Sequence, residues 1–344
     1  MKLISPSALK PGATIGIFTP SSPANVKYRE KYLHGITVLE KMGFKVIEGS
    51  LTASQKLQGY RSGTPKERAA EFMELIRNPI VTCMISTIGG ANSSSMIPFL
   101  DFDEIRRFPK IICGYSDVTS LHLSILAYAG LKTFYGPAIM PSFGEWPDML
   151  AETKESFLNA VQIHRSGSRT FQPPTRWSYH LRSASTDAWK IEPRKYEENL
   201  GWRVLNPGTV SAPIVVANLN TLMTSAGTSY FPKIQGNILL IEEMNAPFSE
   251  EERHLRHLER LGAFDEISGL IISKPEVYDK ESAPFEYDDL ILEIVGTKRK
   301  YPIVSNFDCG HTNPMVTIAE MASVSLDAKH DYDTEFKVLE PMVC

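Results

Sequence analysis

Short apolar runs alternate with amphipathic helical patterns along the first half of the chain. Continuous apolar runs predict strands at 13–18, 45–49, 81–87, 110–114 and 133–136. Apolar residues at helical spacing predict helices near 26–42, 65–77, 93–100 and 118–129, the last one closed by Gly130. This βαβ alternation is typical of a parallel, doubly wound sheet and predicts an N-terminal α/β domain.

The second half shows fewer clear βα repeats and predicts a mixed α/β domain. Strands are expected at 209–216, 237–242, 268–273, 302–306 and 321–327, and helices near 218–226, 250–261 and 287–296. Ser249 and Glu252 have the spacing of a capping box at the head of the 250–261 helix. That helix start would leave Glu242 at the end of the preceding strand.

The segment between the two halves differs in composition, being rich in Ser, Arg, Pro and Trp with weak periodicity. We interpret it as a linker with a substrate-facing loop. The predicted organisation is therefore an N-terminal α/β domain over 1–165, a linker and substrate loop over 166–208, and a C-terminal mixed α/β domain over 209–344.

Composition limits the classes of partner and location. The chain has 344 residues, 42% of them hydrophobic, and a formal net charge of -4, which does not suggest a nucleic-acid or membrane-binding surface. A small molecule is the expected partner. The N-terminus lacks the pattern of a secretion signal, and the four cysteines lie far apart without a CxxC pair. We therefore expect a cytoplasmic protein without a disulfide framework.

The passage KIICGYSDVTSL has the layout of a nucleophile elbow. A strand ends at Gly114, Ser116 lies in the turn, and a helix follows at once. Such a turn exposes the hydroxyl, and free N–H groups at the helix start, beginning with that of Asp117, can stabilise an oxyanion. The alternative is that Ser116 or Asp117 simply caps the helix, which is the commoner role of these residue types.

A second strand-to-helix turn, STIGGANSSSM, contains the pair Gly89–Gly90, whose backbone N–H groups could approach a ligand closely. It could equally be a plain turn in which Asn92 or Ser93 caps the helix. Two such loops in one parallel sheet would meet at its carboxyl edge, where ligands bind.

A nucleophilic serine needs a base and an acid. Of eight histidines, His311 stands out because it lies in the loop SNFDCGHTNPM after an apolar strand. Glu242 at a strand end is a well-placed acid to orient it, and Glu243 and Asp308 compete for that role.

Two further histidines are three residues apart on the 250–261 helix. His254 and His257 could share a metal ion, but no third ligand is obvious from the sequence. A solvated helix face is the favoured interpretation, and we predict no metal site.

Six segments together resemble the LD-carboxypeptidase family of serine peptidases in their order and spacing: GYRSGTPKERAAEF, IGGANSSSMIPFLDF, GYSDVTSLHL, NLNTL, ILLIEE and NFDCGHTNPM. The resemblance implies Ser116 as nucleophile, Glu242 as acid and His311 as general base. It also implies an oxyanion hole from the N–H groups of Gly90 and Asp117, no metal or organic cofactor, and a homodimer.

The family contains murein tetrapeptide carboxypeptidases and immunity peptidases that cleave the amide of microcin C. The chain looks more similar to the second branch, because of GYRSGTPKERA, CGHTNPM and a loop at 171–202 that carries Trp177, Trp189 and Trp202. An aminoacyl- or peptidyl-nucleotide is then the expected substrate, with Asn92, Trp189 and Asn220 as candidate binding residues. Val216 and Ala217 replace the family's usual Gly-Gly pair before NLNTL and leave the exact substrate open.

Three alternatives remain at the level of sequence. The chain could be a murein tetrapeptide carboxypeptidase that releases D-alanine. It could be a non-catalytic small-molecule binding protein in which Ser116 is only a helix cap. A cysteine hydrolase built on Cys309 or Cys113 is the least favoured, because Cys113 should be buried in its strand.

Overall fold

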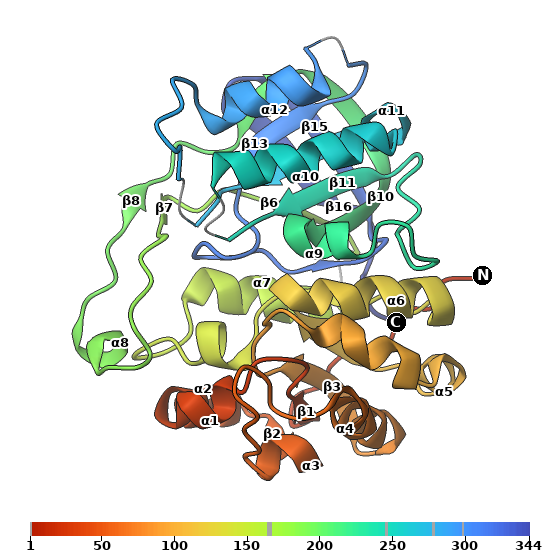
Figure 1. Cartoon of the computed structure of the whole chain (residues 1–344), viewed down its shortest axis with the longest axis vertical. Helices are drawn as coiled ribbons and strands as arrows, with labels where there is room; N and C mark the ends of the chain where they lie inside the picture. Colours follow the sequence, from red (N-terminus) through yellow and green to blue (C-terminus); the bar gives the residue numbers. More distant parts are fainter. Residues whose placement is uncertain (1, 164–166, 245–246, 277–278, 298) are drawn as a thin grey trace.

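The computed structural model describes residues 2–163, 167–244, 247–276, 279–297 and 299–344. Within them the chain forms two lobes, one built on a six-stranded sheet and one on an eight-stranded sheet (Figure 1). The boundary expected at 165/166 lies outside the described residues, so the division into domains stays a prediction. No helix in the described ranges is long and apolar enough to cross a bilayer.

The N-terminal lobe carries a parallel sheet with one antiparallel strand at its edge. The strand order is β14-β5-β4-β3-β1-β2, and β14 pairs antiparallel with β5. The strands are β1 (Thr14–Phe18), β2 (Lys45–Glu48), β3 (Val81–Ser86), β4 (Ile111–Gly114), β5 (Phe134–Tyr135) and β14 (Ile318–Ala319). In β4, Ile111 and Cys113 enter one buried cluster and Ile112 enters another, so both faces of the sheet are covered.

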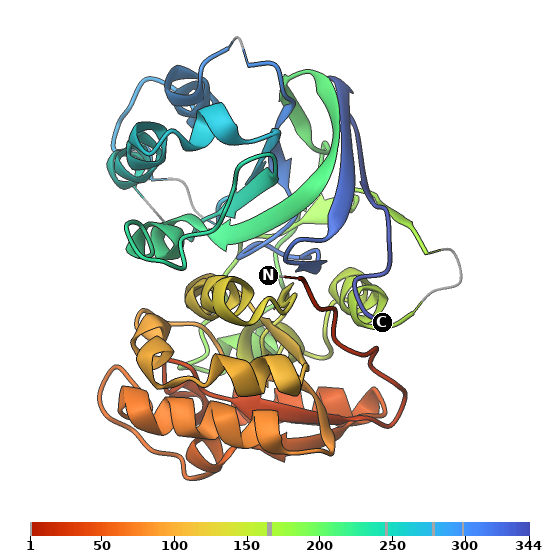
Figure 2. The ribbon, with the colours of Figure 1, turned by 90° about the vertical axis from the view of Figure 1, so that its right-hand side faces the viewer.

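Helices lie on both sides of this sheet (Figure 2). They are α1 (Ala24–Lys27), α2 (Arg29–Lys41), α3 (Ser50–Ala53), α4 (Pro65–Arg77), η1 (Ser93–Phe99), α5 (Phe102–Arg107), η2 (Ser116–Val118), α6 (Thr119–Ala129), η3 (Ile139–Phe143) and α7 (Ala151–Val161). Local sequence explains their ends. Thr64 and Glu67 form a capping box before α4, and Gly130 ends α6 in the left-handed conformation.

The C-terminal lobe carries a mixed sheet in the order β6-β16-β15-β10-β11-β12-β13-β9. The strands are β6 (Arg169–Phe171), β9 (Arg203–Asn206), β10 (Gly208–Asn218), β11 (Ile238–Glu242), β12 (Gly269–Ser273), β13 (Ile303–Phe307), β15 (Ser323–His330) and β16 (Asp333–Val338). The run from β10 to β13 is parallel, and the other pairs are antiparallel. Its helices are α9 (Leu219–Thr224), α10 (Phe248–Arg260), α11 (Ala263–Glu266) and α12 (Tyr287–Val295).

The two lobes are joined by more than one crossing of the chain. A hairpin of β7 (Arg176–Trp177) and β8 (Glu197–Glu198), with α8 (Ala188–Ile191) between them, runs along one side of both lobes (Figure 1). The short strand β14 enters the N-terminal sheet from the C-terminal half of the sequence. One buried cluster contains Phe134 of the first lobe together with Phe307 and Phe336 of the second.

The predicted fold class, a parallel N-terminal α/β unit followed by a mixed α/β unit, is confirmed. Some local predictions are wrong. The helix expected near 26–42 is divided at Tyr28 into α1 and α2, and 93–100 forms a 3-10 helix that contains Pro98. Ser249 does not cap α10, because the helix begins at Phe248 with Pro247 in the capping position. The N–H of Ser249 donates to Glu281.

Candidate active site

Ser116 lies in the turn between β4 and α6 with a backbone φ of 62°. A non-glycine residue in this left-handed region is strained, and such strain persists where the surroundings hold the residue in place. The N–H of Ser116 donates to the Tyr135 hydroxyl over 3.0 Å. A Cβ at Gly114, two residues before the serine, would lie 2.6 Å from Ser86 Oγ and 3.0 Å from both Val118 methyl groups, so glycine relieves crowding beside this turn. The expected elbow is therefore present.

Glu242 ends β11 with a carboxylate that is fully buried and accepts several hydrogen bonds. Tyr135 donates to Oε1, and Asn218 Nδ2 reaches the same oxygen at 3.2 Å. Oε2 lies 2.6 Å from His311 Nδ1. Burial of a carboxylate is tolerated when it is paired and hydrogen-bonded in this way.

His311 lies in the loop after β13. Burial lowers the pKa of its imidazole, but the Glu242 carboxylate and the nearby acids Glu276 and Glu243 outweigh burial and raise it above 6.5. The ring packs edge-on against Tyr115 at 4.9 Å between centroids. Gly310 allows the close approach of the loop to Glu242, since a Cβ there would lie 2.3 Å from Oε2.

The acid, the imidazole and the serine are thus linked through shared hydrogen bonds. With Nδ1 held by the carboxylate, the other imidazole nitrogen of His311 forms no hydrogen bond with another described residue. That nitrogen is the one a general base uses to accept a proton. Likewise, no described residue accepts a hydrogen bond from Ser116 Oγ, and the two side chains do not bond to each other in the ranges described.

The glycine loop after β3 lies against the serine turn. A Cβ at Gly89 would lie 3.0 Å from Ser116 Cβ and 3.2 Å from the backbone N of Asp117. Gly90 has a φ of 146°, and a Cβ there would lie 2.2 Å from Ser21 Oγ. Within the described ranges, the N–H groups of Gly90 and Asp117 donate no hydrogen bond, so both are available to bind a ligand oxygen.

The Asp117 side chain holds the two loops together. Its Oδ2 accepts from the backbone N–H groups of Asn92 and Ser93, each at 2.9 Å. Asn92 therefore lies beside the serine turn, and its buried Oδ1 has no partner among the described residues. Asp117 does not act as a helix cap for α6 but as a bridge between the loops.

The competing acids and thiols have other surroundings. Asp308 is paired with Lys274 at 2.7 Å and accepts from Trp202 Nε1 at 2.8 Å. Glu243 accepts from Asn218 at 3.0 Å and from the Asn220 N–H at 2.8 Å, so neither acid contacts His311. Burial raises the pKa of the Cys113 and Cys309 thiols, which disfavours a thiolate nucleophile.

The other two expected binding residues form no hydrogen bond with Ser116, Glu242 or His311 in the part of the chain that the structure describes. Trp189 on α8 is 3% exposed and packs against His34 and Trp146, with ring centroids 5.8 and 5.9 Å away. Asn220 borders a surface hollow of about 650 Å³ together with His257. Both binding assignments stay predictions.

The loop that carries Trp189 is fixed to the first lobe by buried charges. Arg194 donates to Glu145 through Nε at 3.1 Å and Nη2 at 2.7 Å, and Arg182 donates to the same carboxylate. Glu145 is 3% exposed, so this contact is shielded from water. Trp202, near the end of the loop, is a core residue that packs on Phe307.

Sequence reasoning missed two residues that shape the site. Tyr135, inside the expected strand 133–136, bonds both the Ser116 backbone and Glu242. Asn218 bonds both Glu242 and Glu243. The only signal in the sequence is that each residue ends a strand, since polar groups at strand ends converge on one edge of a parallel sheet.

Comparison with known proteins agrees with this geometry. Residues 15–136 match the LD-carboxypeptidase N-terminal domain, and residues 211–326 match the LD-carboxypeptidase C-terminal domain. The microcin C7 self-immunity protein MccF of Escherichia coli is 40% identical over 319 residues, which cover 92% of this chain and 91% of that protein. The "Probable murein peptide carboxypeptidase" of Bacillus subtilis is 27% identical over 326 residues, covering 94% and 91%.

Solved structures of MccF superpose on nearly the whole chain. MccF in complex with aspartyl sulfamoyl adenosine matches with a TM-score of 0.92 and 36% identity, over 99% of this chain and 100% of that one. The complex with glutamyl sulfamoyl guanosine matches with a TM-score of 0.92 and 37% identity over the same shares. Fold and relatives define a serine peptidase. The chain belongs to the LD-carboxypeptidase family.

Proposed function

We propose that this chain hydrolyses the amide bond of aminoacyl- or peptidyl-nucleotides of the microcin C type, with Ser116 as nucleophile, His311 as general base and Glu242 as its acid. The observation that carries the proposal is the hydrogen-bonded path from the Ser116 backbone through Tyr135 to Glu242 and His311. Similarity to MccF, whose structures contain aminoacyl sulfamoyl nucleosides, supports the substrate class.

The reaction begins when His311 Nε2 takes the proton of Ser116 Oγ and the oxygen attacks the amide carbonyl carbon. The N–H groups of Gly90 and Asp117 bind the oxyanion of the tetrahedral intermediate. His311 then gives its proton to the leaving nitrogen as the C–N bond breaks, leaving an acyl-serine. Water then attacks the ester with His311 again acting as base. The acyl group leaves as a carboxylic acid, and Ser116 regains its free hydroxyl.

Glu242 acts through His311 throughout. Its Oε2 fixes the imidazole orientation and stabilises the imidazolium that forms in each step. Tyr135 and Asn218 hold the other carboxylate oxygen in place. A homodimer and a cytoplasmic location remain part of the proposal as predictions.

The second candidate is a murein tetrapeptide carboxypeptidase, which the Bacillus subtilis relative favours. Both candidates use the same acyl chemistry and differ in the group that leaves. A nucleotide leaving group would need a surface for its base, whereas D-alanine would need only a carboxylate contact.

The test compares hydrolysis of an aminoacyl-sulfamoyl adenosine and of a murein tetrapeptide by the wild type, Ser116→Ala and Ser120→Ala. Ser120 is a matched control because it is a buried serine on α6, the helix that follows the Ser116 turn. Cleavage of the adenosine conjugate that is lost only in Ser116→Ala is the expected result. Release of D-alanine alone would make the murein tetrapeptide the substrate in place of the aminoacyl-nucleotide. Turnover by Ser116→Ala would refute the triad.

A further inference from the structure

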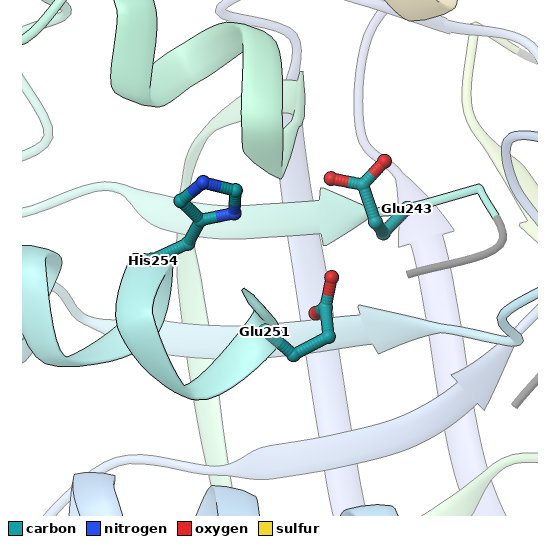
Figure 3. Close-up of side chains that lie close together, drawn as sticks. All are labelled: Glu243, Glu251 and His254. Carbon is teal, nitrogen blue, oxygen red and sulfur yellow. The ribbon is translucent and has the colours of Figure 1, made fainter. Parts of the chain in front are cut away.

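Behind the catalytic acid, three side chains converge that the proposed chemistry does not use. Glu243 follows β11, and Glu251 and His254 lie three residues apart on α10. One ligand atom from each lies within 4.8 Å of the other two. Figure 3 shows the two carboxylates and the imidazole directed toward a common space between the strand end and the helix.

Two of these groups lack partners on the side that faces the space. Glu251 is 3% exposed, and only its Oε2 is bonded, to the Tyr287 hydroxyl at 2.6 Å. Its Oε1 and the Nδ1 of His254 are buried without a hydrogen-bond partner among the described residues. Buried polar atoms are usually paired, so these two atoms have the capacity to bind a ligand in the space between them.

Charge leads to the same conclusion. Two carboxylates brought together away from water repel each other unless a proton or a cation lies between them. In the described ranges, neither Glu243 nor Glu251 forms an ion pair with a lysine or an arginine.

We propose that Glu243, Glu251 and His254 form a binding site for a divalent transition-metal ion, with Zn²⁺ as the ion that best suits two carboxylates and one imidazole. These ligand types bind Zn²⁺ at about 2.0–2.2 Å, which places them about 3.4 Å apart in a tetrahedral site. The ligand atoms lie within 4.8 Å of one another, so metal binding would draw them closer together. Water completes the coordination, because His254 also borders the open hollow lined by Asn220 and His257.

The site is separate from the triad but adjoins it through one residue. Asn218 Nδ2 donates to Glu242 at 3.2 Å and to Glu243 at 3.0 Å. The proposed ligand set differs from the pair His254 and His257 that the sequence suggested. On α10, His254 is directed toward the two glutamates, whereas His257 borders the hollow. Of the two ligands that the sequence did not reveal, Glu251 lies on the same helix as His254, and Glu243 comes directly after β11.

The experiment measures metal binding directly, without an activity assay. Full-length protein freed of metal with a chelator is titrated with Zn²⁺ in a calorimeter, and Co²⁺ binding is followed by its visible absorption. The variants are His254→Gln and Glu251→Gln, with His257→Gln as the matched control on the same helix. We expect one Zn²⁺ per chain, affinity at least about 10-fold weaker in both cluster variants, and an unchanged control.

Several results would overturn the site. They are no Zn²⁺ binding by the wild type, wild-type affinity in His254→Gln, or equal loss in His257→Gln. Binding of Mg²⁺ or Ca²⁺ as tightly as Zn²⁺ would also overturn it, because those ions avoid imidazole. Melting curves without metal show whether each variant is folded. If Glu251→Gln is not, His254→Gln decides the question, since its side chain is only partly buried.

Discussion

The hydroxyl of Tyr135 donates a hydrogen bond to the buried carboxylate of Glu242 and accepts one from the backbone of Ser116. The two residues come from different sheets, since Tyr135 ends β5 and Glu242 ends β11. One phenol oxygen therefore fixes the strained serine turn of the first lobe relative to the buried Glu242 carboxylate of the second.

Replacing Tyr135 with Phe tests this link with almost no change in shape. The Ser116 N–H and Glu242 Oε1 would each lose a buried partner, at a cost of about 1–3 kcal/mol per group. If half of the summed loss falls on the transition state, kcat/KM drops about 10- to 100-fold. Steady-state kinetics and a thermal melt measure both effects. Wild-type values for both would show that the phenol oxygen is dispensable.

Gly310→Ala should disable the site through a single methyl group. The new Cβ would lie 2.3 Å from Glu242 Oε2, forcing the His311 loop away from the acid. A displacement of about 1 Å is expected to reduce kcat/KM by about 100-fold. Gly296→Ala is the matched control, because Gly296 has a φ of 91° against 94° for Gly310 but nothing within 4 Å of the added Cβ. Equal losses in both variants would attribute the effect to backbone strain alone.

Activity should rise with pH through the titration of His311. The general base works only when neutral, and its pKa lies above 6.5 because Glu242 stabilises the imidazolium. The midpoint of the plot of kcat/KM against pH is therefore expected above pH 6.5, with low activity at more acidic pH. Glu242→Gln removes the stabilising charge and should move the midpoint of His311, followed by NMR, to lower pH. An unchanged or higher midpoint would contradict this account.

Glu145→Gln should loosen the loop that carries Trp189. Removing one partner of a buried ion pair costs about 3–5 kcal/mol, and here both Arg182 and Arg194 would lose their carboxylate. A lower melting temperature and faster tryptic cleavage within 171–202 are expected. Glu155→Gln serves as control, because its pair with Arg169 at 2.7 Å is solvent-exposed. Similar behaviour of the two variants would mean that the loop is held by other contacts.

Much of the fold follows from local pattern. Helix α4 has the predicted bounds 65–77 because Thr64, Pro65 and Glu67 determine its start within one turn. The elbow at Ser116 could be expected because a buried strand, a glycine and a helix follow one another directly. Strand β14 could not be predicted from the sequence, since a strand of two residues shows no periodicity and its partner β5 is distant in sequence.

Only part of the site can be predicted from the sequence. Residue type and position at a strand end select Ser116, Glu242 and His311 as candidates, but the choice among Glu242, Glu243 and Asp308 depends on side-chain direction. The structure settles which acid contacts the imidazole through distances that sequence cannot supply. The Glu243, Glu251 and His254 cluster was missed for the same reason, because its members come from two elements.

The loop that carries His311 leaves the eight-stranded sheet at β13 and enters the six-stranded sheet at β14. His311 therefore belongs to a segment anchored in both lobes, called here the strap. Any opening of the lobes would pull on this strap and separate the imidazole from the serine turn. Neither half of the chain would then be an active enzyme by itself. A chimera with one half taken from a relative would be active only where the strap still pairs with the edge of β5.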